Sequence, residues 1–250
     1  MSTPSFRLDG QVALVSGAGR GIGRGCALAL AEAGAEVIAL SRTEAELLTL
    51  AREIEAAGGR ARALVCDVTD TAAVRAAIAG LERLDVLLNN AGSNQPQPFL
   101  EVEEAVLDRL LALNVKAAFV VAQAAARVMA RSGGGAIVNM SSQMGHVGGA
   151  GRTVYCATKH AIEGLTKAMA VDLAPYNIRV NAVAPTFVET PLTRPFFEDP
   201  AFKALVLDKI LLGRLARIEE VAAAVVYLAS PAAAMITGTS LLVDGGWTAH

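Results

Sequence analysis

Short apolar segments alternate with longer amphipathic segments from one end of the chain to the other. The apolar segments have the character of buried strands and lie at residues 12–16, 37–40, 63–66, 86–89, 136–140, 179–183 and 240–243. The segments between them have helical periodicity and lie at residues 21–33, 44–57, 71–81, 106–129, 154–173 and 218–228. Near-continuous apolar strands separated by helices are buried on both faces. The pattern predicts an α/β fold: a doubly wound, Rossmann-type parallel sheet of about seven strands with helices on both faces.

Residues 1–250 are predicted to form a single dinucleotide-binding catalytic domain, because no linker rich in proline, serine or charge divides them. Residues 186–212 depart from the alternating pattern. This stretch holds three prolines and four phenylalanines, at positions Pro191, Pro195, Pro200, Phe187, Phe196, Phe197 and Phe202. An insert of this length at the C-terminal end of a strand is typical of a substrate lid. Phe187, Phe196 and Phe197 would either line an apolar wall over the substrate or pack between subunits.

Charge and cysteine content narrow the classes of partner. A formal net charge of −2 offers no basic surface for nucleic acid or for a membrane surface. Cys26, Cys66 and Cys156 form no CxxC pair, which argues against both a disulfide framework and a thiolate metal site. The chain lacks a secretion signal at its start, an apolar run of about 20 residues and clustered metal ligands. We therefore expect a cytoplasmic protein without a catalytic metal.

A glycine-rich turn joins the first strand to the first helix. Gly17, Gly21 and Gly23 would permit a tight turn and a close approach of the backbone to a pyrophosphate, which then lies at the positive end of the helix. Arg20 and Ile22 belong to the same turn. Glycines of this kind also occur for packing alone, so this signal is weak without others.

Two further strand ends carry polar residues that suit a dinucleotide. Asp67, followed by Val68, ends the third strand, where a carboxylate can accept a hydrogen bond from an adenine amine. Asn90 lies in the small loop 89–92 after the fourth strand, where it would line the cofactor trough. Each could be an ordinary turn. Because they follow successive strands, together they favour a cofactor site.

The end of the second strand distinguishes NAD from NADP. An acidic residue there would bind the ribose 2′-hydroxyl, whereas a basic residue would accommodate a 2′-phosphate. The chain has Ser41, Arg42 and Thr43 at this point, with no acid before Glu44. Arg42 can form charge-assisted hydrogen bonds with a phosphate, and Arg20 can reach the same group. We expect NADP; the alternative is that Arg42 stacks over the adenine and serves NAD.

Tyr155 and Lys159 are four residues apart, so in a helix they share one face. A cation beside a phenol favours the phenolate and lowers the phenol pKa. Ser142 lies upstream of Tyr155, and Asn114 lies further back in the chain. Each residue has a structural explanation on its own. Together with the glycine turn they indicate a site for hydride transfer with a tyrosine as proton donor.

These motifs resemble those of the short-chain dehydrogenase/reductase family, and the resemblance covers the whole chain. The matching segments are residues 16–23, 89–92, 155–159 and 178–183, with Asn114 and Ser142. Within the family, residues 40–43, 141–143, 154–156 and 184–186 resemble the dicarbonyl/L-xylulose reductase group, which uses NADPH and reduces α-dicarbonyls and ketoses. Arg152 differs from what we expect in that group, which leaves the substrate open.

The resemblance implies a role for each matching residue. Tyr155 would be the general acid in reduction and the general base in oxidation. Lys159 would lower the pKa of Tyr155 and bind the nicotinamide ribose. Ser142 would hydrogen-bond the substrate carbonyl oxygen, and Asn114 would hold a water in a proton relay leading from Lys159 to solvent.

The resemblance extends to the nicotinamide end of the site and to the assembly. Beyond Pro185, the backbone of Val188 and the side chain of Thr190 would orient the carboxamide of the nicotinamide. Family members are commonly tetramers in which the long helices around Leu110 and Leu165 pair between subunits. The apolar character of these helices agrees with a homotetramer, and burial within one subunit would explain it as well.

Several functions remain open at this stage. The first is reduction of a small carbonyl compound, with Gln143 and Arg152 beside Ser142 and Tyr155 in the substrate pocket. A sugar-acid dehydrogenase would use Arg152 to bind a carboxylate, although Arg152 could equally pair with a nearby acid. A 3-oxoacyl-thioester reductase would favour a basic docking surface, and no strong basic cluster is visible. A non-catalytic cofactor sensor would not need an intact set of proton-transfer residues.

Overall fold

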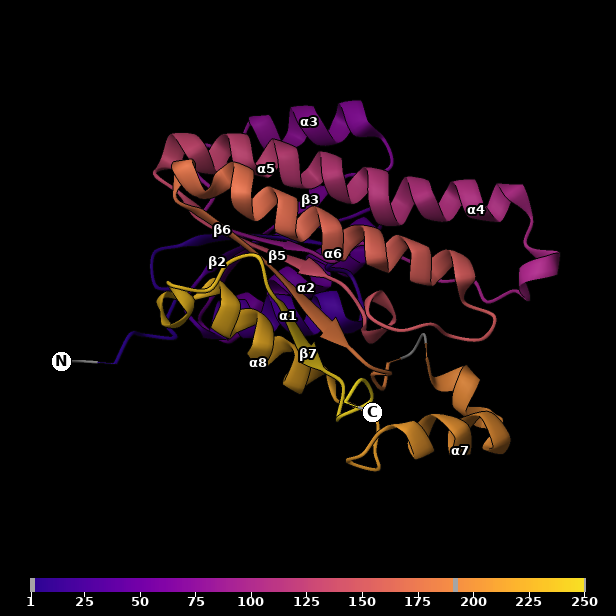
Figure 1. The fold of residues 1–250 in the computed structure, drawn as a ribbon. Coiled ribbons are helices and arrows are strands. Elements are labelled where there is room, and N and C mark those ends of the chain that lie inside the picture. The colour runs from indigo at the N-terminus through magenta and orange to yellow at the C-terminus, as the bar shows by residue number, and fades with distance from the viewer. Residues whose placement is uncertain (1–2, 191–192, 250) are drawn as a thin grey trace.

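The computed structural model describes residues 3–190 and 193–249, with the side chains of residues 195 and 196 left out (Figure 1). Seven strands form one sheet in the order β3-β2-β1-β4-β5-β6-β7, and every neighbouring pair is parallel. The strands are β1 (Val12–Ser16), β2 (Glu36–Ser41), β3 (Arg60–Val65), β4 (Val86–Asn89), β5 (Gly135–Met140), β6 (Ile178–Pro185) and β7 (Ser240–Val243). The predicted fold class is confirmed.

Helices cover both faces of the sheet (Figure 1). One layer contains α3, α5 and α6 with α4 at its end, and the other contains α1, α2 and α8. The helices are α1 (Gly21–Glu32), α2 (Glu44–Ala56), α3 (Thr71–Ala79), α4 (Glu104–Leu111), α5 (Ala118–Ser132), α6 (Thr153–Leu173), α7 (Pro200–Lys209) and α8 (Ile218–Ala229). The described residues contain no helix that is both long enough and apolar enough to span a bilayer.

The strands are apolar throughout because each face of the sheet meets a helical layer. Leu14 and Leu87 point into the cluster under α3, α5 and α6, whereas Val15 and Leu88 point into the cluster under α1 and α8. All four side chains are completely buried. Successive residues of a strand face opposite sides, so two apolar layers require apolar residues at every position.

The strand order changes direction beside β1. The chain runs outward from β1 to β2 and β3, then crosses over to β4 on the other side of β1. Connections that leave neighbouring strands in opposite directions separate at the carboxyl ends of those strands. The loops that follow β1 and β4 therefore lie where ligands usually bind in such sheets, and the segments after β5 and β6 extend the same edge.

The predicted helix at residues 106–129 is interrupted. It consists of α4, a π-helical turn (Ala112–Ala117) and α5, and Asn114 lies in the π turn. The amide Nδ2 of Asn89 donates to the carbonyl oxygen of Ala118 at 2.8 Å, directly after this turn. Single π turns occur frequently at functional sites. The apolar repeat continues across the turn, so the sequence pattern alone did not reveal it.

The segment predicted as a substrate lid contains regular structure. A 3₁₀ turn (Arg194–Glu198) precedes α7, whose first turn is capped by Asp199 through the amide of Ala201 at 2.9 Å. Pro191 lies outside the described residues. Helix α7 lies apart from the two layers that cover the sheet (Figure 1).

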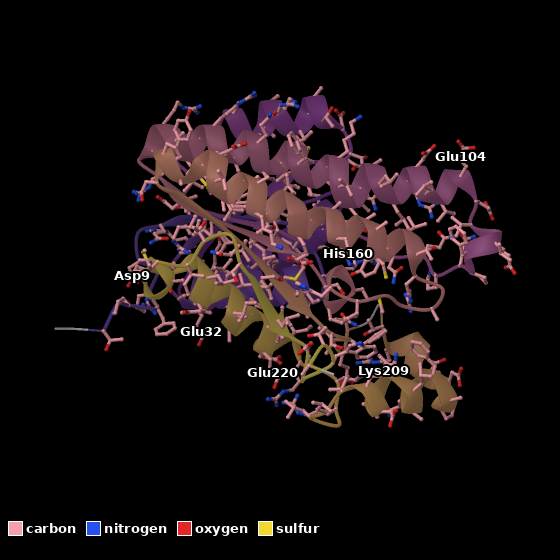
Figure 2. All side chains as sticks on the ribbon, viewed as in Figure 1. Asp9, Glu32, Glu104, His160, Lys209 and Glu220 are labelled. Carbon is pink, nitrogen blue, oxygen red and sulfur yellow. The ribbon has the colours of Figure 1, made fainter. Side chains whose placement is uncertain are left out.

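Aromatic side chains connect this segment to the C-terminal residues. The ring of Phe187 lies 5.7 Å from that of Phe197, 5.8 Å from that of Phe202 and 5.8 Å from that of Trp247. Lys209, at the end of α7, faces the same region, with its Nζ 5.5 Å from the Trp247 ring centroid (Figure 2). The segment is therefore anchored within its own subunit, and its role as a lid stays a prediction.

Candidate active site

The glycine turn between β1 and α1 is closely packed. Gly17 has a φ of +67°, a conformation that residues with a side chain rarely adopt. A Cβ at Gly23 would clash with the carbonyl oxygen of Gly17 and lie 2.5 Å from Nδ2 of Asn90. Glycine at position 23 therefore lets helix α1 approach both the turn and the loop after β4.

Hydrogen bonds join this turn to the loop after β4. The buried Ser16 hydroxyl accepts from the backbone amides of Asn90 at 2.9 Å and Ala91 at 3.0 Å. Nδ2 of Asn90 donates to the carbonyl oxygen of Ser16 at 3.0 Å. The predicted cofactor segments after β1 and β4 are thus in direct contact. The role of Ser16 was missed; its only signal in the sequence is a hydroxyl residue at the end of an apolar strand.

The start of α1 suits an anion. No side chain caps this helix and no acidic residue lies in its first turn. In contrast, Asp70 caps α3 by accepting from the amides of Ala72 and Ala73. Uncapped amides at a helix N-terminus are well placed to bind a phosphate. Arg20 is exposed beside them and Ile22 packs against the core, so this turn fits a dinucleotide pyrophosphate.

Arg42 and Asp67, predicted as separate cofactor residues, approach each other at the ends of β2 and β3. Nη1 of Arg42 lies 3.6 Å from Oδ2 of Asp67. The backbone amide of Thr69 donates to Asp67, and this bond, the Thr69 hydroxyl and the Arg42 charge hold the pKa of Asp67 below its usual value. Ser41 accepts from the amide of Thr43 at 3.3 Å, and Val68 is buried beside Asp67.

A carboxylate that the sequence reasoning missed lies at the same end. The side chain of Glu46, in the first turn of α2, contacts the glycine turn at Gly19, where a Cβ would clash with it. Glu46 lies beyond the end of the second strand in the sequence. Helix α2 brings one back over the turn, so the adenosine end holds acidic and basic groups together.

The predicted nicotinamide residues follow β6. Val188 forms an isolated parallel bridge with Ala216 beyond Pro185. The hydroxyl of Thr193 donates to the carbonyl oxygen of Val188 at 2.6 Å and lies 3.1 Å from the hydroxyl of Thr190. Thr193 was missed, since nothing in an irregular segment marks it. It fixes the backbone and side chain that were predicted to hold the carboxamide.

Tyr155 and Lys159 lie in the first two turns of helix α6 and on one face of it, as their spacing predicts. Nζ of Lys159 donates to the carbonyl oxygen of Met140 at the end of β5, at 2.7 Å, and lies 5.5 Å from the centroid of the Tyr155 ring. Burial lowers the pKa of Lys159 to about 8, and the nearby carboxylate of Glu163 opposes this change.

Ser142 occupies the turn that links β5 to α6. It caps a 3₁₀ turn (Gln143–Gly145), accepting from the amide of Met144 at 3.2 Å. Its hydroxyl donates to Oε1 of Gln143 at 2.7 Å, and both side chains are buried. The structure therefore brings the predicted serine, Gln143 and Tyr155 together.

Burial raises the pKa of Tyr155 above its ordinary value, while hydrogen bonding with Ser142 and the charge of Arg152 act to lower it. The net change is upward because desolvation outweighs these two contributions. The predicted lowering of this pKa by Lys159 stays a prediction. A raised pKa keeps the phenol protonated at neutral pH. In this state the side chain can donate a proton and cannot accept one.

Asn114 is held at both ends of its amide. Oδ1 accepts from the amide of Ser93 at 2.9 Å, and Nδ2 donates to the carbonyl oxygen of Ser93 at 2.8 Å and to the hydroxyl of Thr158 at 3.1 Å. Thr158 precedes Lys159 on α6 and is completely buried. The π turn thus places Asn114 beside the helix that carries the tyrosine and lysine. Its place in a relay to solvent stays a prediction.

Arg152 is buried one turn before Tyr155, at the point where α6 begins. Its guanidinium carbon lies 6.0 Å from the centroid of the Phe187 ring. Burial lowers the pKa of Arg152, and its charge acts on Tyr155. A buried cation of this kind beside the phenol suits a polar or anionic group of a substrate. In the described part of the chain, no cluster of three or more acidic, histidine or cysteine side chains could hold a metal ion.

Comparisons with known proteins identify the family of this chain. The family profile described as enoyl-(acyl carrier protein) reductase matches residues 17–248. An L-xylulose reductase from Bos taurus is 44% identical over 98% of this chain and 99% of its own. A D-erythrulose reductase from Gallus gallus is 42% identical over 98% of each chain.

A crystal structure of a related enzyme shows the same fold. Gluconate 5-dehydrogenase from Burkholderia cenocepacia, solved in complex with NADP and tartrate, superimposes with a TM-score of 0.96 at 39% identity and covers 100% of both chains. The profile and the relatives both span nearly the whole chain. The identities of the relatives are well above those at which only a fold is shared. The chain therefore belongs to the short-chain dehydrogenase/reductase family of NAD(P)-dependent oxidoreductases.

Proposed function

We propose that this protein is an NADP(H)-dependent oxidoreductase that interconverts a ketose or dicarbonyl compound and the corresponding secondary alcohol. The observation that carries the proposal is the meeting of Ser142, Tyr155 and Lys159 at the carboxyl ends of the strands, beside the glycine turn after β1. A nicotinamide cofactor, when bound, supplies the hydride. The protein supplies the positions and the proton.

The side chains divide the proton chemistry between them. Tyr155, protonated at neutral pH, donates its proton to the substrate oxygen in reduction. Ser142 donates a hydrogen bond to the same oxygen, which it can do by turning its hydroxyl away from Gln143. Lys159 binds the nicotinamide ribose, and Asn114 holds the water through which Tyr155 regains a proton.

A small hydroxylated substrate agrees with the polar character of the site. Gln143 is buried beside Ser142 and Arg152 is buried near Tyr155, and groups that donate and accept hydrogen bonds there match hydroxyl and carbonyl oxygens. The similar proteins from Bos taurus and Gallus gallus are reductases of L-xylulose and of D-erythrulose. These are ketoses, which supports the same class of substrate here.

The preference for NADP rests on the basic side chains at the adenosine end. Arg42 has an exposed side chain and would meet a 2′-phosphate together with Ser41 and Arg20. Asp67 and Glu46 lie close by and oppose that charge. NAD is the alternative, in which Arg42 remains with Asp67 and stacks over the adenine.

A direct assay tests this function. The purified protein is mixed with NADPH or NADH and a panel of diketones, ketoses and keto acids, and the nicotinamide absorbance is followed. We expect NADPH to be consumed with diketones or ketoses and to be preferred over NADH. A preference for NADH would overturn the cofactor assignment. Tight cofactor binding without turnover would instead favour a cofactor sensor.

A sugar-acid substrate is the second candidate, and Arg152 is the observation that favours it. Arg152 is buried at the N-terminus of α6, one turn before Tyr155, where a substrate carboxylate could bind. The gluconate 5-dehydrogenase structure contains tartrate, a hydroxy acid. In this alternative, the polar pocket would hold the hydroxyl groups and Arg152 the carboxylate.

Replacement of Arg152 by alanine decides between the two candidates. If Arg152 binds a carboxylate, KM for keto acids should rise by roughly 10- to 100-fold, as expected for one lost charge-assisted hydrogen bond, and KM for neutral ketoses should change little. Arg194→Ala removes an exposed arginine of the lid and serves as the control. An equal loss on neutral ketoses would reject the carboxylate role.

For the assembly, we infer a homotetramer that pairs through α4, α5 and α6. Apolar side chains remain exposed there, with fractions of 39% for Leu111, 48% for Phe119 and 76% for Val171. Leu110 itself is buried within the subunit, so Leu111 and Phe119 replace it as the residues expected at the interface. The cytoplasm remains the expected location.

A further inference from the structure

A second polar cluster lies one helical turn beyond Lys159, and the proposed chemistry does not use it. Glu163 on α6 is buried, with 7% of its surface exposed. The hydroxyl of Ser240, at the start of β7, donates to Oε1 of Glu163 at 3.0 Å. Nε2 of His146 lies 3.3 Å from the same oxygen and 3.0 Å from the Ser240 hydroxyl. Three separate elements therefore meet at one carboxylate.

This cluster is in direct contact with the turn that carries Ser142. His146 ends that turn, and Gly145 lies against α6 so closely that a Cβ would be 3.1 Å from Cγ of Glu163 and 2.9 Å from the hydroxyl of Ser141. Because Ser240 gives its proton to Glu163, Nε2 of His146 acts as the donor in its contacts with both. The carboxylate is thus fixed from two sides, and its position relative to α6 is well defined.

Glu163 is also the carboxylate whose charge acts on Lys159. Lys159 is buried, and the hydrogen-bond partner of its ammonium is the neutral carbonyl group of Met140. A buried cation is stable only when an opposite charge or a full set of hydrogen bonds compensates for its desolvation. Residues four apart on a helix are close enough for such compensation.

Few other charges face this pair among the described residues. Tyr155 faces Lys159 from the same helix, and the charge of Arg152 acts on Tyr155. His146 is the titratable group that faces Glu163 from the neighbouring turn. From the sheet, β5 contributes the carbonyl group of Met140 and β7 the neutral hydroxyl of Ser240.

We propose that Glu163 is a positioning residue for hydride transfer: its carboxylate, fixed by Ser240 and His146, keeps Lys159 in the charged form. This inference rests on the function proposed above. Lys159 is charged below its pKa and neutral above it, and burial already lowers that pKa to about 8. Removal of the Glu163 charge would lower it further, because an opposite charge on a close neighbour stabilises the ammonium. The upper pH limit of activity would then be lower.

Glu163→Gln tests the proposal because it removes the charge and keeps the shape and the hydrogen-bond acceptor. The chain has five lysines, so the titration of each can be followed by NMR with lysine labelled with ¹³C at Cε, and Lys159→Arg identifies the signal. We expect the midpoint of Lys159 to fall by roughly one pH unit in Glu163→Gln. Asp172→Asn, an exposed carboxylate on the same helix, should leave it unchanged.

Kinetics provide the second measurement. The alkaline limb of the pH profile of kcat/KM for reduction should move to lower pH in Glu163→Gln. In Glu163→Asp, which keeps the charge, the limb should lie close to its original position. A purely structural role would lower the whole profile without moving the limb. If Glu163→Gln does not fold, Glu163→Ser also removes the charge and carries the same test.

The NMR titration tests the role of Glu163 separately from the proposed oxidoreductase function. It needs no substrate, so it decides the role of Glu163 even if no tested carbonyl compound is reduced. An unchanged Lys159 midpoint in a folded variant without the Glu163 carboxylate would overturn the inference.

Discussion

Replacement of Tyr155 by phenylalanine is expected to reduce kcat by roughly 10²- to 10⁴-fold, the usual contribution of a general acid. Desolvation raises the pKa of the phenol, so it is the protonated donor at neutral pH. Phenylalanine keeps the ring and loses only the hydroxyl group. The affinity for NADPH should therefore change little, as measured by quenching of protein fluorescence or by calorimetry.

The control for this experiment is Tyr176→Phe. Tyr176 follows α6, with 55% of its surface exposed, and lies outside the site. It should retain full activity. If Tyr155→Phe turned over substrate as fast as the original protein, Tyr155 could not be the proton donor.

Replacement of Gly23 by alanine is expected to weaken cofactor binding by roughly 10- to 100-fold and to lower the free energy of unfolding by about 1–3 kcal/mol, as overpacking usually does. The added methyl group would clash with the carbonyl oxygen of Gly17 and approach Nδ2 of Asn90 to 2.5 Å. These are groups of the glycine turn and of the loop after β4, so relief of the clash must move the turn itself. Thermal unfolding and titration with NADPH measure the two effects.

Gly164→Ala is the matched control, since Gly164 lies in the interior of α6 and a Cβ there meets no atom within 4 Å. Alanine in a helix is favoured over glycine by up to about 1 kcal/mol, so this variant should be at least as stable as the original. Unchanged NADPH affinity in Gly23→Ala would contradict the assignment of the turn as the pyrophosphate site.

The arrangement of the sheet was predictable because its signal is local. Strands buried on both faces must be apolar at every position, and β1, β4 and β7 coincide with the predicted segments 12–16, 86–89 and 240–243. The glycine turn and the spacing of Tyr155 and Lys159 are local as well. These local patterns are sufficient to predict where the candidate site lies.

Contacts between distant segments were not predictable in this way. The π turn at Asn114 depends on how α4 and α5 pack, and the apolar repeat runs through it unchanged. Glu46 reaches the glycine turn only because α2 folds back over it. The direction of the Tyr155 pKa shift depends on the balance between burial and charge. The spacing of residues along a helix does not show how strongly a side chain is desolvated.

Transfer of deuterium is the most direct test of the central claim. NADPH labelled with deuterium at C4 of the nicotinamide, in each of its two stereoisomers, is incubated with a ketose that the protein reduces. We predict one deuterium at the new carbinol carbon from one of the two stereoisomers, with one NADPH consumed for each alcohol formed. A product that contains no deuterium from either stereoisomer would contradict hydride transfer at this site.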